Sequence, residues 1–356
     1  MPERAAFFFN GQGSVMKHRT FFWFFLPTGL AMLIFIAAPI VSVVMQSLFV
    51  PHEAVLVETE NCGPFGCTTA VAVDQDATEQ LRAEQPLGRF AGLEIYLDRG
   101  HLAFGEIAEA WLITTSLGEF FSELGDLPFY RALSFTLTYT FVVTPLLIAL
   151  GFAIALAVNS LTQKIKGFVI FFSLLPMIVT PLVGSLILFW MIDSRGVLGT
   201  LIQYLADDQT LSLKASTSLM WCALIIYGIW SSAPFAFVVF YAGLQTVPQD
   251  TLESARIDGA TRWQQVRYVV LPHLMPLVTF VALIQLMDNF RVFEPIVGFN
   301  ASAHAQSLSW IIFNDLGGET RQLSAAATTS VLTIIGVAIL LSPVLVRTWR
   351  DFKGKA

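Results

Sequence analysis

The sequence predicts an all-α polytopic membrane protein with six transmembrane helices, a cytoplasmic helical elbow and a small extracytoplasmic insertion between the first two helices. Of the 356 residues, 55% are hydrophobic and only 13% are charged, and the mean hydropathy is +0.67. Soluble chains carry about twice that charged fraction. Six apolar runs are long enough to cross a bilayer, which takes about 20 residues. A polar segment, residues 246–272, separates the fourth and fifth runs and is called the elbow below.

Prolines interrupt the apolar runs. We expect the six spans at residues 21–48, 130–158, 167–191, 217–243, 273–297 and 324–347. The third span contains Pro176 and Pro181, the fourth Pro234, and the fifth Pro276 and Pro295. Such breaks are tolerated where the freed backbone faces protein or a cavity, and transporters use broken helices to form sites near the midplane. A kink that serves packing alone is an equally weighted alternative for any single proline.

Lysine and arginine are unequally divided between alternate connecting segments. Eleven of the 20 Lys and Arg residues lie in segments 1–20, 159–166, 244–272 and 348–356. The longer segments 49–129, 192–216 and 298–323 hold six. Cytoplasmic loops carry the excess, so both termini and the elbow are expected in the cytoplasm, with residues 130–347 as the core transmembrane domain. No short apolar stretch with a cleavage site stands apart at the N-terminus, so we expect no removed signal peptide.

The elbow is predicted to form two short helices with a bend. Thr246 with Gln249, and Thr261 with Gln264, each have the spacing of a capping box that opens a helix. Gly259 lies between the two, where the first helix must stop and the chain must turn, and glycine accepts positive φ without penalty. Trp263, Val266 and Val270 would then share one face of the second helix. This amphipathic shape suits a groove on a partner or a layer of lipid headgroups.

The motif spacing within the elbow resembles a known signature. Glu253, Ser254 and Ala255 are followed after three residues by Gly259, after nine more by Val269, and then by Leu271 and Pro272. This resembles the cytoplasmic Glu-Ala-Ala, Gly, Ile, Leu-Pro signature of inner-membrane permeases in binding-protein-dependent ABC importers, with Ser254 for Ala and Val269 for Ile. The resemblance makes the elbow a coupling helix that docks on a partner ATPase, and it assigns that role to Glu253, Ser254, Ala255, Asp258, Gly259, Trp263, Leu271 and Pro272.

Ionisable side chains within the fifth span are the next informative feature. Asp288, Arg291 and Glu294 recur every third residue, and Gln285 precedes them. Charges at membrane depth are costly and usually face a cavity or one another. A spacing of three puts them on one side of a helix, so an internal salt-bridge ladder and contact with a ligand are both open.

The resemblance also implies a substrate path, because it extends to maltose-type carbohydrate permeases over nearly all of the chain from about residue 128. Their sugar-contacting positions fall on Met177, Ile178 and Thr180 in the third span, Ser231, Ser232 and Phe235 in the fourth, and Gln285, Asp288 and Asn289 in the fifth. Aromatic faces can stack on a sugar ring while polar groups take its hydroxyls, although most of the 31 Phe are expected to pack in the core or against lipid. The stacking candidates are Trp230, Phe235, Phe290 and Phe293, and Arg291 completes the predicted path.

This chain departs from the family at several of those positions. Phe235 replaces a tyrosine, Asp288 replaces an aromatic residue and Gln285 replaces a serine. The Gly-Gly-Pro usual after the fifth span is absent. The location of the site therefore carries over better than its specificity.

The insertion, residues 49–129, is long and acidic. We expect one or two short strands and then an amphipathic helix from about 104 to 124. Maltose-type permeases carry an insertion at the equivalent point that meets the binding protein; a cap over the spans is the alternative. Cys62 and Cys67 enclose a four-residue turn and are expected to form a disulfide rather than remain free thiols. We expect no metal site, because His52 is the only histidine nearby, and we expect Cys222 in the core of a span.

These features together predict a permease subunit of an ABC importer for a sugar, oligosaccharide or sugar alcohol in the bacterial inner membrane. Its partners would be a second permease subunit, an ATPase dimer, an extracytoplasmic binding protein and membrane lipid. No Gly-x-x-x-x-Gly-Lys-Ser/Thr loop is present, so the chain is not expected to be an enzyme or to hold a cofactor, and partner ATPases would bind ATP and magnesium. The net charge of −6 and the lack of a basic stripe argue against nucleic acid.

Two competing functions remain open at this point. An ion-coupled secondary transporter could use the carboxylates of Asp288 and Glu294, but it leaves the elbow unexplained. A membrane-embedded enzyme is the third possibility, and no nucleophile–base pair or metal set is apparent on the spans.

Overall fold

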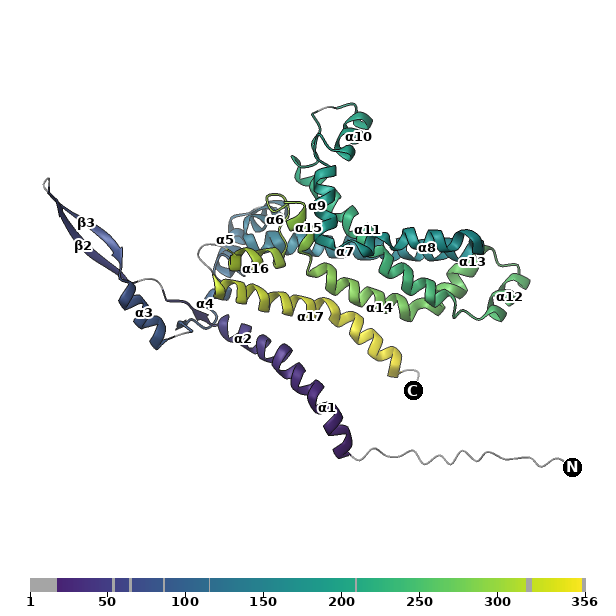
Figure 1. Cartoon of the computed structure of the whole chain (residues 1–356), viewed down its shortest axis with the longest axis horizontal. Coiled ribbons are helices and arrows are strands. Elements are labelled where there is room, and N and C mark those ends of the chain that lie inside the picture. The colour runs from purple at the N-terminus through teal and green to yellow at the C-terminus, as the bar shows by residue number, and fades with distance from the viewer. Residues whose placement is uncertain are drawn as a thin grey trace.

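Helices dominate the chain, as the apolar runs predict (Figure 1). The computed structural model describes residues 18–353 except 53–54, 64–65, 86, 115, 209 and 318–321. Within these residues, five helices are long and apolar enough to cross a membrane, and there are six spans if one sharply bent pair counts as one. The predicted number of spans is therefore met by five continuous helices and one broken one.

Four of the continuous spans lie close to their predicted limits. They are Phe22–Gln46, built from α1 (His18–Met32), the π-helical η1 (Leu33–Ala37) and α2 (Ala38–Gln46); α7 (Pro128–Ser160); α11 (Thr217–Leu244); and Leu323–Arg350 within α17 (Leu323–Lys353). The fifth begins at Arg262 and ends at Phe290, whereas residues 273–297 were predicted. The hydropathy pattern misses this shift because the polar start of the helix resembles a loop.

The third span is broken where the prolines predicted a break. Helix α8 (Gln163–Ile178) and helix α9 (Pro181–Met191) meet at 94°. Val179 and Thr180 between them have extended backbone conformations. Proline disfavours the α conformation in the residue before it and is well suited to the first position of a new helix, so Pro181 accounts for the break. By contrast, Pro145, Pro176, Pro234, Pro276 and Pro343 lie inside helices.

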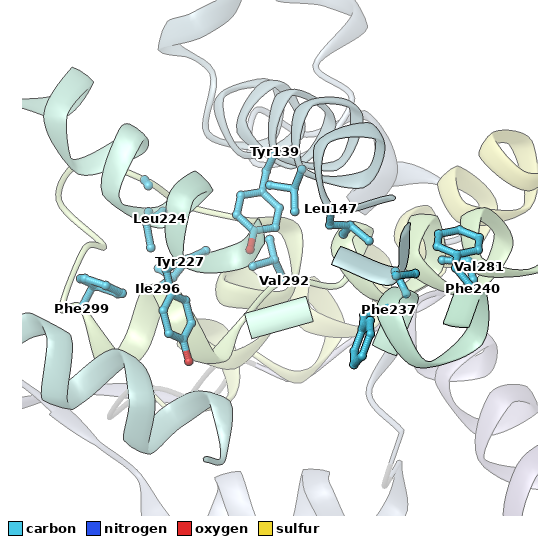
Figure 2. Close-up of a cluster of buried hydrophobic side chains, with 14 of the residues drawn as sticks. Tyr139, Leu147, Leu224, Tyr227, Phe237, Phe240, Val281, Val292, Ile296 and Phe299 are labelled. Atoms are coloured by element: carbon cyan, nitrogen blue, oxygen red, sulfur yellow. The ribbon is translucent and has the colours of Figure 1, made fainter. Parts of the chain in front are cut away.

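The core forms where α7 crosses α11. Large apolar side chains from the two helices interleave, and residues at the far end of the fifth span join them (Figure 2). Gly151 allows a close approach of the two helices, because a Cβ atom at this position would lie 2.6 Å from the Cβ of Ala236 and 2.8 Å from the backbone nitrogen of Phe237. The labelled members of the cluster are Tyr139, Leu147, Leu224, Tyr227, Phe237, Phe240, Val281, Val292, Ile296 and Phe299.

The prediction that Cys222 lies in the core is wrong. Its side chain is exposed on α11. An apolar residue on a membrane span has two compatible environments, the bundle interior and the lipid face, so hydropathy alone does not distinguish them.

The insertion is folded and projects from the bundle (Figure 1). Its elements are β1 (Phe49–Val50), β2 (Leu56–Gly63), β3 (Gly66–Val73), α3 (Gln75–Glu84), β4 (Arg89–Phe90), α4 (Glu94–Leu97), α5 (Phe104–Ile113) and α6 (Leu117–Asp126). Strands β2 and β3 form an antiparallel hairpin and β1 pairs with β4. One or two short strands were predicted where the described residues contain four, and helices α3 and α4 were not predicted. The carboxylate of Asp74 caps α3 by accepting a hydrogen bond from the Ala77 amide at 3.0 Å.

The single helix predicted from about 104 to 124 is wrong, because the segment contains two helices. Ser116 begins the second, and its hydroxyl accepts a hydrogen bond from the Glu119 amide at 3.3 Å. A capping side chain of this kind favours a new helix start over continuation of the previous one. The predicted disulfide concerns Cys62 and Cys67, which face each other in the hairpin register. Their side chains lie outside the described part of the chain, and the bond stays a prediction.

Three further short helices follow the third and fifth spans. They are α10 (Val197–Ala206), α15 (Glu294–Gly298) and α16 (Leu308–Gly317). Helix α10 follows α9 away from the bundle (Figure 1). Lys214 connects the segment after α10 to the end of α9. Its ammonium group bonds the Asp193 carboxylate at 2.7 Å and lies 3.5 Å from the centre of the Phe189 ring. The hydrogen bond from Lys214 lowers the pKa of the Asp193 carboxyl below its usual range.

Candidate functional site

A cavity of about 460 Å³ lies where helices α7, α9 and α11 meet the end of the fifth span. It is lined by Tyr139, Pro181, Ser231, Ser232, Gln285, Asp288, Asn289, Arg291, Val292, Phe293, Glu294 and Pro295. Seven of these residues belong to the substrate path predicted from the sequence: Ser231, Ser232, Gln285, Asp288, Asn289, Arg291 and Phe293. The structure therefore brings the predicted residues of the fourth and fifth spans together on one hollow.

Beyond the end of the fifth span, the cavity wall at residues 291–293 is irregular backbone rather than continuous helix. Helix α14 (Leu271–Phe290) ends at Phe290, and α15 begins at Glu294. Proline is favoured in the first turn of a helix, and Pro295 occupies that place in α15. The break turns backbone and side chains toward the cavity, an arrangement that is tolerated at membrane depth only where protein or water lines the space.

The predicted salt-bridge ladder is only partly correct. A guanidinium nitrogen of Arg291 lies 2.9 Å from a carboxylate oxygen of Asp288, and both side chains are about half exposed. Glu294 does not continue the ladder, because the helix ends before Arg291 and the one-sided spacing is lost. Among the described residues, no basic side chain lies within 4.0 Å of the Glu294 carboxylate.

Two amide side chains form the buried floor of the cavity. Gln285 and Asn289 are 5% and 6% exposed. The Asn289 amide nitrogen donates a hydrogen bond of 3.0 Å to the hydroxyl oxygen of Thr144 on α7. Buried polar groups are costly without a partner, so this bond fixes the orientation of Asn289. The arrangement offers hydroxyl, amide and carboxylate groups within one space, which suits a ligand with many hydroxyl groups.

The other predicted path residues do not line the cavity. Met177 is 62% exposed, Trp230 is 45% exposed and Thr180 is also exposed, while Phe235 packs against the hydrophobic core. The third span contributes Pro181 instead, because the break after Ile178 turns the residues before it away. Of the stacking candidates, Phe290 is fully buried and unavailable to a ligand, and Phe293 alone lines the hollow.

The second span also contributes to the site, which was not predicted from the sequence. Tyr139 lines the cavity, and Thr144 holds Asn289. A signal for this face was present, since Thr136, Thr140 and Thr144 recur at four-residue intervals within the predicted second span. All three are buried.

The elbow lies at the opposite end of the fifth span from the cavity (Figure 1). It consists of α12 (Gln249–Ile257), α13 (Arg262–Gln265) and the π-helical η2 (Val266–Val270), and η2 leads directly into α14. Gly259 has a φ of +80°, as its place in the motif predicts. Its Cβ position is open, with no atom within 4 Å, so the backbone conformation, and not a lack of space, favours glycine here.

One of the two predicted capping boxes is confirmed. Thr261 accepts a hydrogen bond from the Gln264 amide at 3.3 Å, and the Gln264 side chain accepts from the Thr261 amide at 2.8 Å. The other is wrong: α12 begins after Pro248, and the Thr246 hydroxyl donates to the Gly243 carbonyl at the end of α11 instead. The preceding helix competes for Thr246 because that helix ends only two residues earlier.

The second elbow helix is the start of the fifth span rather than a separate short helix. Val270 is buried and Val266 half-buried against the bundle, but Trp263 is 69% exposed, so the predicted common face is wrong for Trp263. Of the other predicted coupling residues, five lie in α12 or at the turn after it, and Leu271 and Pro272 lie at the start of α14. Glu253, Ser254, Asp258, Gly259 and Pro272 are exposed, and Ala255 and Leu271 are half-buried.

The chain is similar to known membrane transport proteins. The family model described as "Binding-protein-dependent transport system inner membrane component" matches residues 128–349. The probable ABC transporter permease protein y4oQ of Sinorhizobium fredii is 29% identical over 239 residues, which cover 64% of this chain and 72% of that protein. The trehalose transport system permease protein SugA of Mycobacterium tuberculosis is 30% identical over 181 residues, which cover 51% of this chain and 57% of SugA.

A solved structure shares the fold. It is a bacterial ABC transporter involved in the import of the acidic polysaccharide alginate, with a TM-score of 0.58 and 20% sequence identity. The match covers 78% of this chain and 97% of that chain. At this identity the likeness concerns the arrangement of the helices.

Proposed function

Because the chain belongs to the family of inner membrane components of binding-protein-dependent transport systems, we propose that it is a permease subunit of a carbohydrate ABC importer. It forms the translocation path for a sugar, oligosaccharide or sugar alcohol. The observation that carries this proposal is the single helix Arg262–Phe290, which has the elbow at one end and the polar cavity at the other. Relatives named as sugar transport permeases support the class of ligand.

The continuous fifth span suggests how the two ends communicate. A helix of 29 residues is about 40 Å long, and in this mechanism it moves as one rod. Closure of the partner ATPases on ATP would shift the elbow, and the rod would carry that shift to Gln285, Asp288 and Asn289 in the cavity wall. Rigid rocking of packed helices is a common way of alternating access to a central site. ATP and magnesium are bound by the partner ATPases in this mechanism.

Four partners follow from the exposed surfaces. The exposed turn around Glu253 and Gly259 docks in a groove of the ATPase dimer in the cytoplasm, where both termini of the chain also lie. No residue of the first span, Phe22–Gln46, is buried. Lipid and a second permease subunit therefore cover this apolar helix. The acidic insertion receives the extracytoplasmic binding protein.

The ion-coupled alternative is less well supported. It requires Asp288 and Glu294 to exchange protons, but Asp288 is held in an ion pair with Arg291. It also gives the elbow no function, although the family to which the chain belongs works with a binding protein.

Co-purification tests the proposed assembly. A tagged copy of the chain, extracted from the membranes of its own host in mild detergent, is expected to bring down a second permease subunit and two copies of an ATP-binding-cassette ATPase. Recovery of the chain only as a monomer or homo-oligomer, in detergents that preserve a control ABC importer, would contradict the proposal.

Replacing Asn289 by alanine is expected to lower uptake while assembly and basal ATPase activity stay nearly intact. A lost neutral hydrogen bond costs about 0.5–1.5 kcal/mol, which corresponds to a roughly two- to tenfold fall in transport. Initial uptake rates across ligand concentrations provide the measurement. Asn159→Ala is the matched control, because this exposed amide bonds Gln245 near the elbow end of α11 and lies outside the cavity. Unchanged kinetics in Asn289→Ala would remove Asn289 from the path.

Replacing residues 56–84 by a short Gly-Ser linker is expected to weaken stimulation of the ATPase by the binding protein. This segment contains six acidic residues and only one basic residue. An acidic face favours a basic patch on the partner and accelerates encounter in a salt-sensitive way. The spans should still insert, because β1 and β4 and the hydrogen bond of 2.6 Å between the Tyr96 and Ser47 hydroxyls remain to seat the insertion.

The measurement is ATPase activity of the complex in nanodiscs, with and without binding protein, at low and high salt. In the unmodified complex, the stimulation of ATPase activity by the binding protein should fall as salt rises. In the deletion variant, this stimulation should be weak at low salt and should change little at high salt. Neutralising Asp76 and Glu79 to the amides within an intact insertion is the control that separates charge from shape. A deletion variant that responds like the unmodified complex would leave the insertion as a cap.

A further inference from the structure

The charges in the cavity wall do not balance. Among the residues that line it, the ionisable ones with formal charge are Asp288, Arg291 and Glu294. The single guanidinium is engaged by Asp288 at 2.9 Å, and no other basic group in the described chain lies within 4.0 Å of a lining carboxylate. The Glu294 carboxylate therefore gives the cavity an uncompensated negative charge.

The fold holds Glu294 at the cavity wall. Its backbone carbonyl accepts a hydrogen bond of 3.4 Å from the Ser185 hydroxyl of α9. Helices α9 and α15 pack so closely that a Cβ atom at Gly298 would meet the Ser185 side chain. The side of α15 toward α9 is thus filled, while the Glu294 side chain itself is exposed and lines the hollow. The negative charge of Glu294 is therefore held at one place on the cavity wall.

We propose that Glu294 makes the cavity a charge filter that admits neutral and amine-bearing sugars and rejects anionic saccharides such as uronic acids. That the ligand is a sugar rests on the proposed function; the sign of the filter rests on the cavity alone. A fixed charge about 6 Å from a charged ligand changes its energy enough to alter occupancy by about tenfold at intermediate dielectric constants. The effect weakens as salt rises, because the cavity is open to solvent.

The sign of the field can be measured without any transport. Ser232 lines the same cavity, and Ser232→Cys in the assembled complex provides a reporter thiol. The probes are a cationic and an anionic methanethiosulfonate, which carry a trimethylammonium and a sulfonate group and react with thiols in the same way. The quantity of interest is the ratio of the cationic to the anionic labelling rate, divided by that ratio for a free thiol. Labelling of the native cysteines is subtracted with the complex that lacks the reporter.

The corrected ratio is expected to exceed one and to fall about tenfold when Glu294→Gln is added to the reporter. Glu294→Asp, which keeps the charge, should preserve the ratio. Asp207→Asn is the matched control for charge removal elsewhere, since Asp207 is exposed beyond α10 and does not line the cavity. A ratio at or below one, or a ratio unmoved by Glu294→Gln, would overturn the filter. Failure of both Ser232→Cys and a second reporter, Ser231→Cys, to react would also overturn it, because the space would then be closed to charged solutes.

The filter also predicts that Glu294→Gln changes the selectivity of uptake between neutral, basic and acidic sugars. Uptake of glucose-, glucosamine- and glucuronate-containing probes is compared between Glu294→Gln and the unmodified importer with one binding protein, so that the selectivity of the binding protein cancels in the ratio. Glu294→Gln should raise uptake of the acidic probe about tenfold relative to the neutral one. An equal effect on all three probes overturns the filter and leaves sugar transport standing, whereas a cavity with the expected sign and no uptake of any sugar counts against the proposed function.

Discussion

Replacing Gly151 by leucine is expected to remove most of the folded, assembled protein from the membrane. At Gly151 the backbones of α7 and α11 lie close together, and even a Cβ atom there would lie 2.6 Å from Ala236 and 2.8 Å from the Phe237 backbone. Backbone cannot yield as a flexible side chain can, so the two helices must separate. Overpacking of a core costs about 1–3 kcal/mol and sometimes more, and four added carbons at a backbone contact lie at the upper end.

The measurement is the yield and thermal stability of the detergent-solubilised complex, followed by size-exclusion chromatography after heating. Gly167→Leu is the matched control, because Gly167 lies on the exposed side of α8 with no atom within 4 Å of its Cβ position. The control should elute like the unmodified protein. A monodisperse Gly151→Leu complex with unchanged thermal stability would show that this helix crossing is not as the structure describes it.

Replacing Gly259 by valine is expected to uncouple the permease from its ATPase by about tenfold or more. The residue has a φ of +80° and open space around its Cβ position, so the substitution adds backbone strain without a steric clash. A β-branched residue in this region is a pronounced outlier, and such strain costs about 1–3 kcal/mol. The turn would relax, and Glu253 and Asp258 would no longer be presented together.

Coupling is measured as ATPase retained on the purified permease and as ligand transported per ATP hydrolysed. Gly259→Asn is the informative control, since asparagine tolerates positive φ and should retain most coupling. Stoichiometric ATPase and normal uptake in Gly259→Val would mean that the elbow is not the coupling element.

The spans could be predicted because their causes are local. Hydropathy sets where a helix can cross a bilayer, and Pro181 breaks the third span through its own covalent geometry. The positive φ of Gly259 and the cap at Thr261 also depend on residues within one turn. The helices of the insertion were harder to predict from the sequence, because they depend on individual capping residues such as Asp74 and Ser116 rather than on long periodic patterns.

The cavity was predicted only in part, because its geometry is not local. Gln285, Asp288 and Asn289 follow from the charged row in the fifth span and from the family resemblance. The end of α14 at Phe290 could not be predicted in this way. Because the helix ends there, Glu294 lies apart from the Asp288–Arg291 ion pair. Thr144 becomes part of the site only because α7 packs against α14, 145 residues further along the chain.

ATP-dependent uptake in proteoliposomes tests the central claim most directly. The complete complex is reconstituted with a radiolabelled sugar that its binding protein retains, and ATP is placed on the side of the ATPases. We expect accumulation that requires ATP hydrolysis and the binding protein, and that continues when a protonophore removes the ion gradient. Accumulation driven by an imposed proton gradient without ATP, and lost in Asp288→Asn or Glu294→Gln, would instead make the chain an ion-coupled transporter.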